Sequence, residues 1–288
     1  MAKSRPKVIL FDIGGVCVVS PFQAILDYEL KLGTPPGWIN YSISQSGPQG
    51  AWSQIERGLV PLDESFFAKF NEDLHRPHLW RAFCAREAGA GRRDMPPAAQ
   101  PVVVPPLPAL DGEWLFNHIF ASATAPDPWM LPALQRLRES GRYVLGALSN
   151  TVIFPPGHAL YRADFFGDDI KSIFDVFVSS AHVGLRKPDP EIYRLALERL
   201  NAFARGNAHT KRGAAGGWGD GVKPEEVLFL DDIGENLKAA RAQGFGTIKV
   251  HLGRAFEAVE ELEKVTGLSL AGSHQRVPTR SDLQKAKM

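Results

Sequence analysis

The chain has 288 residues, 44% of them hydrophobic, and its 33 basic and 32 acidic residues leave a formal net charge of +1. This length is enough for one substantial core, or for a core with a smaller companion domain. The near-zero charge, with no basic stripe and no polybasic helix, argues against nucleic-acid or membrane-surface binding. The two cysteines, Cys17 and Cys84, make no disulfide framework and fit a reducing compartment.

The N-terminus carries only four consecutive apolar residues, 8–11. A signal peptide needs an apolar run of roughly 7–15 residues, so none is predicted. No stretch approaches the roughly 18–20 apolar residues of a membrane span. We therefore expect a soluble, cytoplasmic protein.

Five short apolar segments predict strands that are buried on both faces. Helical patterns at 129–139, 190–200 and 236–243 separate the later ones. Strands that alternate with helices predict an α/β fold with a parallel, helix-covered sheet. The five segments are 8–11, 143–148, 176–178, 227–230 and 247–250.

The region 21–125 differs, because its helical patterns at 22–32, 62–74 and 113–120 come without a clear buried strand. We interpret it as a helical domain inserted after the first strand, so that 1–20 and 126–270 form the core. The Pro-rich stretch 89–112 forbids a regular helix. The Gly-rich stretch 206–221 is expected to be a mobile surface loop, and the tail 271–288 to be flexible.

Segments with polar residues lie just beyond four of the predicted strands, and the third of them leads into Lys187. In a parallel sheet, ligands bind beyond the carboxyl ends of the strands. We therefore expect these side chains to meet in one crevice. They are Asp12, then Ser149 and Asn150, then Lys187, then Asp231 and Asp232.

These residue types suit phosphoryl transfer through an aspartyl intermediate. A carboxylate, here Asp12, can attack phosphorus directly and divide one hard step into two. A Mg²⁺ ion, which prefers oxygen ligands, would let the two anions approach. Asp12 and Asp232 would offer carboxylates to the metal, the Gly14 carbonyl a third oxygen, and Asp231 a contact through water.

Lys187 would neutralise the nucleophile and a phosphate oxygen. Ser149 and the backbone N–H groups around Asn150 would hydrogen-bond the phosphate. Gly15 is a further candidate for phosphate binding, and with Gly14 it is expected to serve the tight turn after the strand.

Four short motifs carry a family resemblance. Residues 11–16 (Phe-Asp-Ile-Gly-Gly-Val), 148–150 (Leu-Ser-Asn), 186–189 (Arg-Lys-Pro-Asp) and 230–232 (Leu-Asp-Asp) resemble, in order, the motifs of haloacid dehalogenase-like (HAD-like) hydrolases. Residues 229–241 are similar to the subgroup with the N-terminal phosphatase domain of soluble epoxide hydrolase, and to a domain of certain acyl-CoA dehydrogenase family members.

The resemblance covers roughly residues 7–265 apart from the two low-complexity stretches. It implies a Rossmann-like core with a helical cap after the first strand, a Mg²⁺ cofactor and a small phosphorylated substrate. No second α/β-hydrolase domain with a nucleophile elbow is expected. We therefore do not expect the protein to hydrolyse epoxides. Oligomeric state and substrate identity are not readable.

One position departs from the family pattern. HAD phosphatases carry a second aspartate two residues after the nucleophile, which protonates the leaving group, and here that residue is Gly14. General acid–base catalysis contributes roughly 10²–10⁴-fold. The protein could be a slow phosphatase, could use a substrate whose leaving group needs no proton, or could use a cap residue such as Asp27 or Glu56 instead.

Two rival functions follow from Gly14. One is hydrolysis of a carbon–halogen bond through an Asp12 ester, since halide needs no proton. The other is a weakly active or non-catalytic binding protein. The Asp231–Asp232 pair suits a metal and favours phosphate over halide.

Simpler interpretations of the same residues remain. Asp12 could cap a turn, Asp231 and Asp232 a helix, and Lys187 could be a solvated loop lysine. Ser149 could form a local turn. Asn236 could line the site or lie on the first turn of a helix without contacting it. Cys17 is expected to pack as a small hydrophobic residue.

Overall fold

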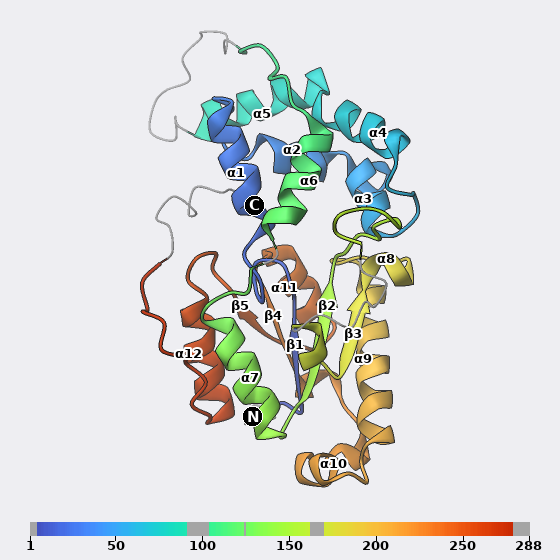
Figure 1. Ribbon diagram of the computed structural model, residues 1–288, viewed down its shortest axis with the longest axis vertical. Coiled ribbons are helices and arrows are strands. Elements are labelled where there is room, and N and C mark those ends of the chain that lie inside the picture. The colour runs from blue at the N-terminus through green and yellow to red at the C-terminus, as the bar shows by residue number, and fades with distance from the viewer. Residues whose placement is uncertain (1–4, 91–103, 124, 162–169, 279–288) are drawn as a thin grey trace.

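The core of the protein is a parallel sheet of five strands. The computed structural model describes residues 5–90, 104–123, 125–161 and 170–278. The strand order is β3-β2-β1-β4-β5, and all neighbouring strands are parallel (Figure 1). The strands are β1 (Val8–Phe11), β2 (Val144–Ser149), β3 (Val176–Ser179), β4 (Val227–Asp231) and β5 (Gly246–Lys249).

Each expected strand is present to within one residue at either end. The reason is burial on both faces. Alternate residues of a strand point to opposite sides: Ile9 and Phe11 join one apolar cluster, whereas Val8 and Leu10 join another. The first cluster includes residues of α7 (Met130–Ser140) and α12 (Ala255–Thr266), and the second includes residues of α9 (Pro190–Gly206) and α11 (Gly234–Ala242).

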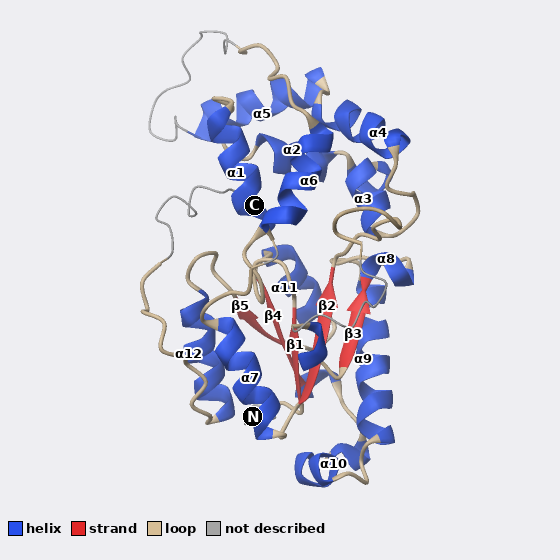
Figure 2. Cartoon of the chain, in the orientation of Figure 1, coloured by secondary structure: helices blue, strands red, loops and turns tan. Residues whose placement is uncertain are grey.

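A second body made of helices lies beyond the carboxyl ends of the strands (Figure 2). It is the cap expected after the first strand, and it has its own aromatic core, with Trp38, Phe70, Phe83 and Phe116 fully buried. Its helices are α1 (Pro21–Lys31), α2 (Trp38–Gln45), α3 (Ala51–Glu56), α4 (Glu64–Leu74), α5 (Pro77–Ala90) and α6 (Gly112–Ser122). The sequence patterns did not predict α2, α3, α5 or α12.

In the described part of the chain, three segments link the cap and the core, in addition to side-chain contacts between them. Two are the linkers on either side of the cap, which run side by side: Val19 N–H donates to the Ala125 carbonyl at 2.9 Å. The third is residues 151–161, which follow β2 and which we call the strap. Val152 and Phe154 of the strap pack into the aromatic core of the cap, and Phe154 lies 5.4 Å from the ring centre of Phe120. The exact domain boundaries stay a prediction.

The Gly-rich stretch 206–221 is not the loop that we expected. It forms α10 (Lys211–Gly216) and a 3₁₀ turn over Trp218–Asp220. Glycine content misled the prediction because the fold here is fixed by one large apolar side chain: Trp218 is buried, and the Arg212 guanidinium lies over its ring. Arg212 also pairs with Asp175 at 2.9 Å, which attaches the segment to the core.

Two other expectations fall partly outside the described residues. Within the Pro-rich stretch 89–112, residues 91–103 are not described, and α5 continues to Ala90. In the tail, 279–288 are not described, but the described part packs on the core: Trp129 Nε1 donates to the Gln275 carbonyl at 3.0 Å.

Among the described residues, no helix is long and apolar enough to cross a membrane.

We expect Trp218→Ala to lower the free energy of unfolding by about 3–5 kcal/mol, because it removes a large buried side chain and leaves a cavity. Chemical denaturation monitored by circular dichroism measures this. The matched control is Trp114→Ala, since Trp114 is 41% exposed and should cost clearly less. Equal losses for the two variants would contradict the anchoring role of Trp218.

Candidate active site

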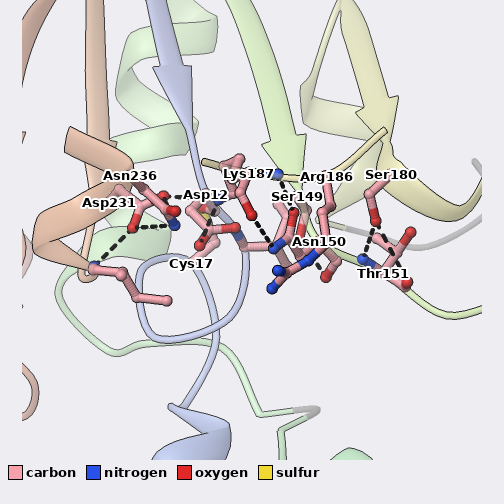
Figure 3. A network of polar contacts seen from close by, with 12 residues as sticks. Asp12, Cys17, Ser149, Asn150, Thr151, Ser180, Arg186, Lys187, Asp231 and Asn236 are labelled. Carbon is pink, nitrogen blue, oxygen red and sulfur yellow. Dashed lines mark hydrogen bonds and ion pairs between the residues drawn. The ribbon is translucent and has the colours of Figure 1, made fainter. Parts of the chain in front are cut away.

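A buried lysine joins two aspartates at the carboxyl edge of the sheet. The Lys187 Nζ atom lies 2.8 Å from Asp12 Oδ2 and 2.7 Å from Asp231 Oδ2 (Figure 3). Asp12 directly follows β1, and Asp231 ends the neighbouring strand β4. Lys187 lies just before α9 and is 1% exposed, which excludes a solvated loop lysine.

The two aspartates also cap their own turns. Ile13 N–H donates to Asp12 Oδ1, and Ile233 N–H donates to Asp231 Oδ1, both at 2.7 Å. The simpler interpretation of Asp12 as a turn cap therefore holds together with its ion pair. The Asn236 amide donates to both oxygens of Asp231 at 3.1 Å, so Asn236 belongs to the site.

Asp232 has no such partners. It is 1% exposed, and neither of its carboxylate oxygens has a hydrogen-bond partner among the described residues. Burial raises the pKa of Asp232 well above its usual value, and the Asp231 and Asp12 carboxylates raise it further. A buried carboxylate without a donor is costly unless a cation balances it.

The three carboxylates suit a divalent cation. Asp12, Asp231 and Asp232 offer oxygens that lie within 4.8 Å of one another. Gly15 makes room for this cluster: it has φ +77°, and a Cβ there would lie 2.4 Å from Asp232 Oδ2. Hard oxygen ligands around an unpaired buried carboxylate fit Mg²⁺.

Asn150 has a structural task that sequence reasoning missed. Its Oδ1 accepts from Lys187 N–H at 2.9 Å, and its Nδ2 donates to the Lys187 carbonyl at 3.1 Å. Its side chain thus holds the backbone of the bridging lysine, and phosphate binding by nearby N–H groups stays a prediction. Ser149 ends β2 and is buried, with Oγ 3.4 Å from the Asn150 carbonyl. The Gly15 N–H already donates to the Val18 carbonyl at 3.0 Å.

The charge states of Lys187 and Asp12 follow from their burial and from the neighbouring charges. Burial raises the pKa of Asp12 to about 6, although Lys187 opposes this. Burial also disfavours the Lys187 ammonium, but Asp12 and Asp231 together outweigh it and raise the pKa of Lys187. The lysine therefore stays charged, and Asp12 holds a proton more readily than an ordinary aspartate does.

Cys17 does not have the environment of a reactive thiol. Its Sγ donates to the Asp12 carbonyl at 3.1 Å, and burial raises the pKa of the thiol well above its usual value. The thiolate is the reactive form of cysteine. Cys17 thus packs in the core, as expected.

The two cap residues considered as proton donors have partners of their own. Asp27 Oδ1 accepts from the Gln23 amide at 2.7 Å. Glu56 Oε2 accepts from Arg186 Nε at 2.7 Å. The Arg186–Glu56 pair carried no sequence signal, because its members lie 130 positions apart.

With this geometry established, comparison with known proteins identifies the family. A model described as haloacid dehalogenase-like hydrolase matches residues 6–244. The chain belongs to the HAD-like hydrolases. This confirms the family that the four motifs indicated, and with it the parallel core with a helical cap.

Similar curated proteins include two that are much longer than this chain. "Bifunctional epoxide hydrolase 2" of Rattus norvegicus is 37% identical over 94% of this chain and 41% of its own length. "Acyl-CoA dehydrogenase family member 10" of Mus musculus is 28% identical over 97% of this chain and 20% of its own length. The HAD-like chain thus spans about two fifths of the first relative and one fifth of the second.

A shorter relative is "Phosphorylated carbohydrates phosphatase" of Thermotoga maritima, 28% identical over 64% of this chain and 71% of its own length. A solved structure of "a Dehalogenase" aligns over 92% of this chain and 98% of its own, with a TM-score of 0.50 and 16% identity. That likeness concerns the fold alone.

We expect Mg²⁺ to stabilise this HAD-like protein more strongly as the pH rises from 5 to 8. Without the cation, the raised pKa of Asp12 means that its contribution to stability is present below about 4 and is lost as the pH rises through about 6. The cation needs ionised carboxylates, so its binding releases protons. Asp232 acts in the same direction.

Thermal unfolding with and without Mg²⁺ at several pH values measures this linkage. In Asp12→Asn the increase near pH 6 should be smaller, because one titrating ligand is gone. A Mg²⁺ effect that is the same at pH 5 and pH 8 would contradict the assignment.

Proposed function

We propose that this protein is a Mg²⁺-dependent phosphatase of a small phosphorylated metabolite, which works through an aspartyl-phosphate intermediate on Asp12. The observation that carries the proposal is the buried Asp232 carboxylate, which lies beside Asp12 and Asp231 and whose two oxygens have no hydrogen-bond partner in the described part of the chain. A cation site next to an aspartate nucleophile suits a phosphate, whereas halide chemistry needs no metal there.

The metal would be held by the Asp12 and Asp232 carboxylates and the Gly14 carbonyl, with Asp231 acting through water. When bound, Mg²⁺ would neutralise charge between the nucleophile and the phosphate. Asp231 suits an indirect role because Lys187, Asn236 and the Ile233 N–H already occupy its oxygens.

The residues of the chain divide the reaction between them. The Asp12 carboxylate would attack phosphorus, an oxygen–phosphorus bond would form, and the bond to the leaving oxygen would break with its electron pair. Lys187 would hold the nucleophile and stabilise charge on the phosphate. Ser149 would donate a hydrogen bond to a phosphate oxygen. Water would then attack phosphorus, the bond between Asp12 and phosphorus would break to free the carboxylate, and the proton lost by the water would leave with inorganic phosphate.

The acid with which the family protonates the leaving group is missing at its usual position, because that residue is Gly14 here. The backbone lets a side chain begin at this position, because a Cβ on Gly14 would lie 3.4 Å from Pro21 Cδ, an ordinary contact. A glycine here favours substrates whose leaving group departs without a proton. The same feature favours the second candidate, carbon–halogen hydrolysis through an Asp12 ester.

We expect phosphate release from a panel of small phosphate esters to need Mg²⁺ and to disappear in Asp12→Asn, because the amide cannot act as the nucleophile. Asp63→Asn is the control, since Asp63 caps the exposed start of α4 and asparagine caps helices equally well. It should keep full activity.

Each other outcome points to one alternative. Release that persists in Asp12→Asn would exclude Asp12 as the nucleophile. Halide release from 2-chloropropionate without Mg²⁺ would favour the dehalogenase. A wild type that releases neither phosphate from the esters nor halide from 2-chloropropionate would favour a binding protein.

We expect Gly14→Asp to accelerate hydrolysis of alkyl phosphates at least about tenfold, because the new carboxyl can protonate the leaving oxygen. Acetyl phosphate, whose leaving group needs no proton, should change little. Gly14→Asn has the same shape but no acidic proton, so it should not accelerate either substrate. Equal effects of the two variants in initial-rate assays would rule out a missing acid as the cause of slow turnover.

A further inference from the structure

The cap places one carboxylate against the core beside the bridging lysine. Glu56 is the last residue of α3 and is 8% exposed. Its Oε2 accepts from both Nε and Nη2 of Arg186 at 2.7 Å. Arg186 directly precedes Lys187, so this ion pair connects the cap to the segment that carries the ammonium of the site.

The same carboxylate oxygen reaches Asn150. The Asn150 Nδ2 atom lies 3.5 Å from Glu56 Oε2 and 3.1 Å from the Lys187 carbonyl. Asn150 also accepts from Lys187 N–H, so its amide contacts both backbone polar groups of that residue. Figure 3 follows this row of contacts from Asp12 through Lys187 to Asn150 and Arg186.

A second contact holds the end of α3 on the core independently of the Glu56 carboxylate. The Ser180 hydroxyl of α8 (Ser180–Val183) donates to the Glu56 carbonyl at 2.5 Å and accepts from Thr151 N–H at 2.8 Å. Two residues further, Gly58 has φ +64°, and a Cβ there would lie 2.2 Å from the Ala181 carbonyl oxygen. Only glycine allows this close approach.

We propose that Glu56 is a positioning residue for the reaction: through Arg186 and Asn150, the docked cap holds Lys187 in the place where its ammonium joins Asp12 and Asp231. The proposal rests on the proposed function for its effect on turnover, but not for its effect on Lys187 itself.

The physical argument is one of preorganisation. A catalytic group contributes fully only if it is held in its working geometry, and a misplacement of about 1 Å can cost about 10²-fold in rate. Lys187 is a long side chain with many rotamers, and burial disfavours its charge. Its two carboxylate partners fix the ammonium, whereas Asn150 and Arg186 fix the backbone from which it extends.

The test compares Glu56→Ala with Glu56→Gln. Alanine removes the acceptor but keeps the helix and the Ser180 bond to the backbone. Glutamine keeps an acceptor oxygen and should recover part of the loss. The matched control is Arg212→Met, which breaks the Arg212–Asp175 pair in α10, at the end of the core opposite to the cap (Figure 1). The side chains of Arg212 and Asp175 are 31% and 3% exposed, which is similar to the 26% and 10% of Arg186 and Glu56.

Two quantities are measured. The first is hydrogen exchange of the Lys187 amide, which we expect to be at least about tenfold faster in Glu56→Ala, since opening exposes the bond to Asn150. The second is kcat for acetyl phosphate, a small substrate that limits any effect through cap–substrate contacts, which we expect to fall about ten- to hundredfold. Arg212→Met should change neither, although it should lower stability.

Unchanged exchange and unchanged kcat in Glu56→Ala would overturn the proposal. So would the same changes in Arg212→Met, because they would reflect stability alone. If the wild type released no phosphate from any donor, the proposed function would fail separately. The exchange of the Lys187 amide would still decide whether Glu56 positions that residue.

Discussion

The site depends on the repulsion between carboxylates that the sheet brings together. Parallel strands deliver Asp12 and Asp231 to the same edge, and Asp232 follows at once. In a buried place these charges oppose one another, and the Lys187 ammonium offsets part of the cost. Removing one member of such a buried pair typically costs about 3–5 kcal/mol, because the remaining charge is left without a partner. One ammonium cannot balance three carboxylates, and a bound cation would offset this imbalance.

Much of the core and of this cluster was predictable from the sequence. The strands were readable because both of their faces are buried, so that they appear as unbroken apolar runs. Asp12 and Asp231 were readable because ligand-binding groups follow strands in a parallel fold, and Lys187 because its polar motif lies beyond the third strand. The chemical types of these residues then suggested phosphoryl transfer as the reaction to propose.

The unpredicted features depend on contacts between distant segments. The role of Asn150 near phosphate stays a prediction, whereas the contact of its amide with the backbone of Lys187 was not predicted, because no local spacing reveals it. Glu56 and Arg186 meet only because the cap docks on the core. The stretch 206–221 looked like a loop from its glycines, yet the burial of Trp218 determines its structure. The composition of a segment limits the backbone conformations that it can adopt, whereas tertiary packing determines which of them it adopts.

The strap has a consequence for how such proteins diversify. The cap looks like a module inserted at two neighbouring linkers, which could be exchanged for another cap. Val152 and Phe154, however, belong to the cap's aromatic core although they follow β2 of the sheet. A chimera that joins this core to another cap at the two linkers alone would leave these two side chains facing a foreign surface. If this cap were moved to another core, a void would open where the two side chains pack here. Exchange of the cap in this protein therefore also requires exchange of the strap, which begins immediately after Asn150, the residue whose amide holds the Lys187 backbone.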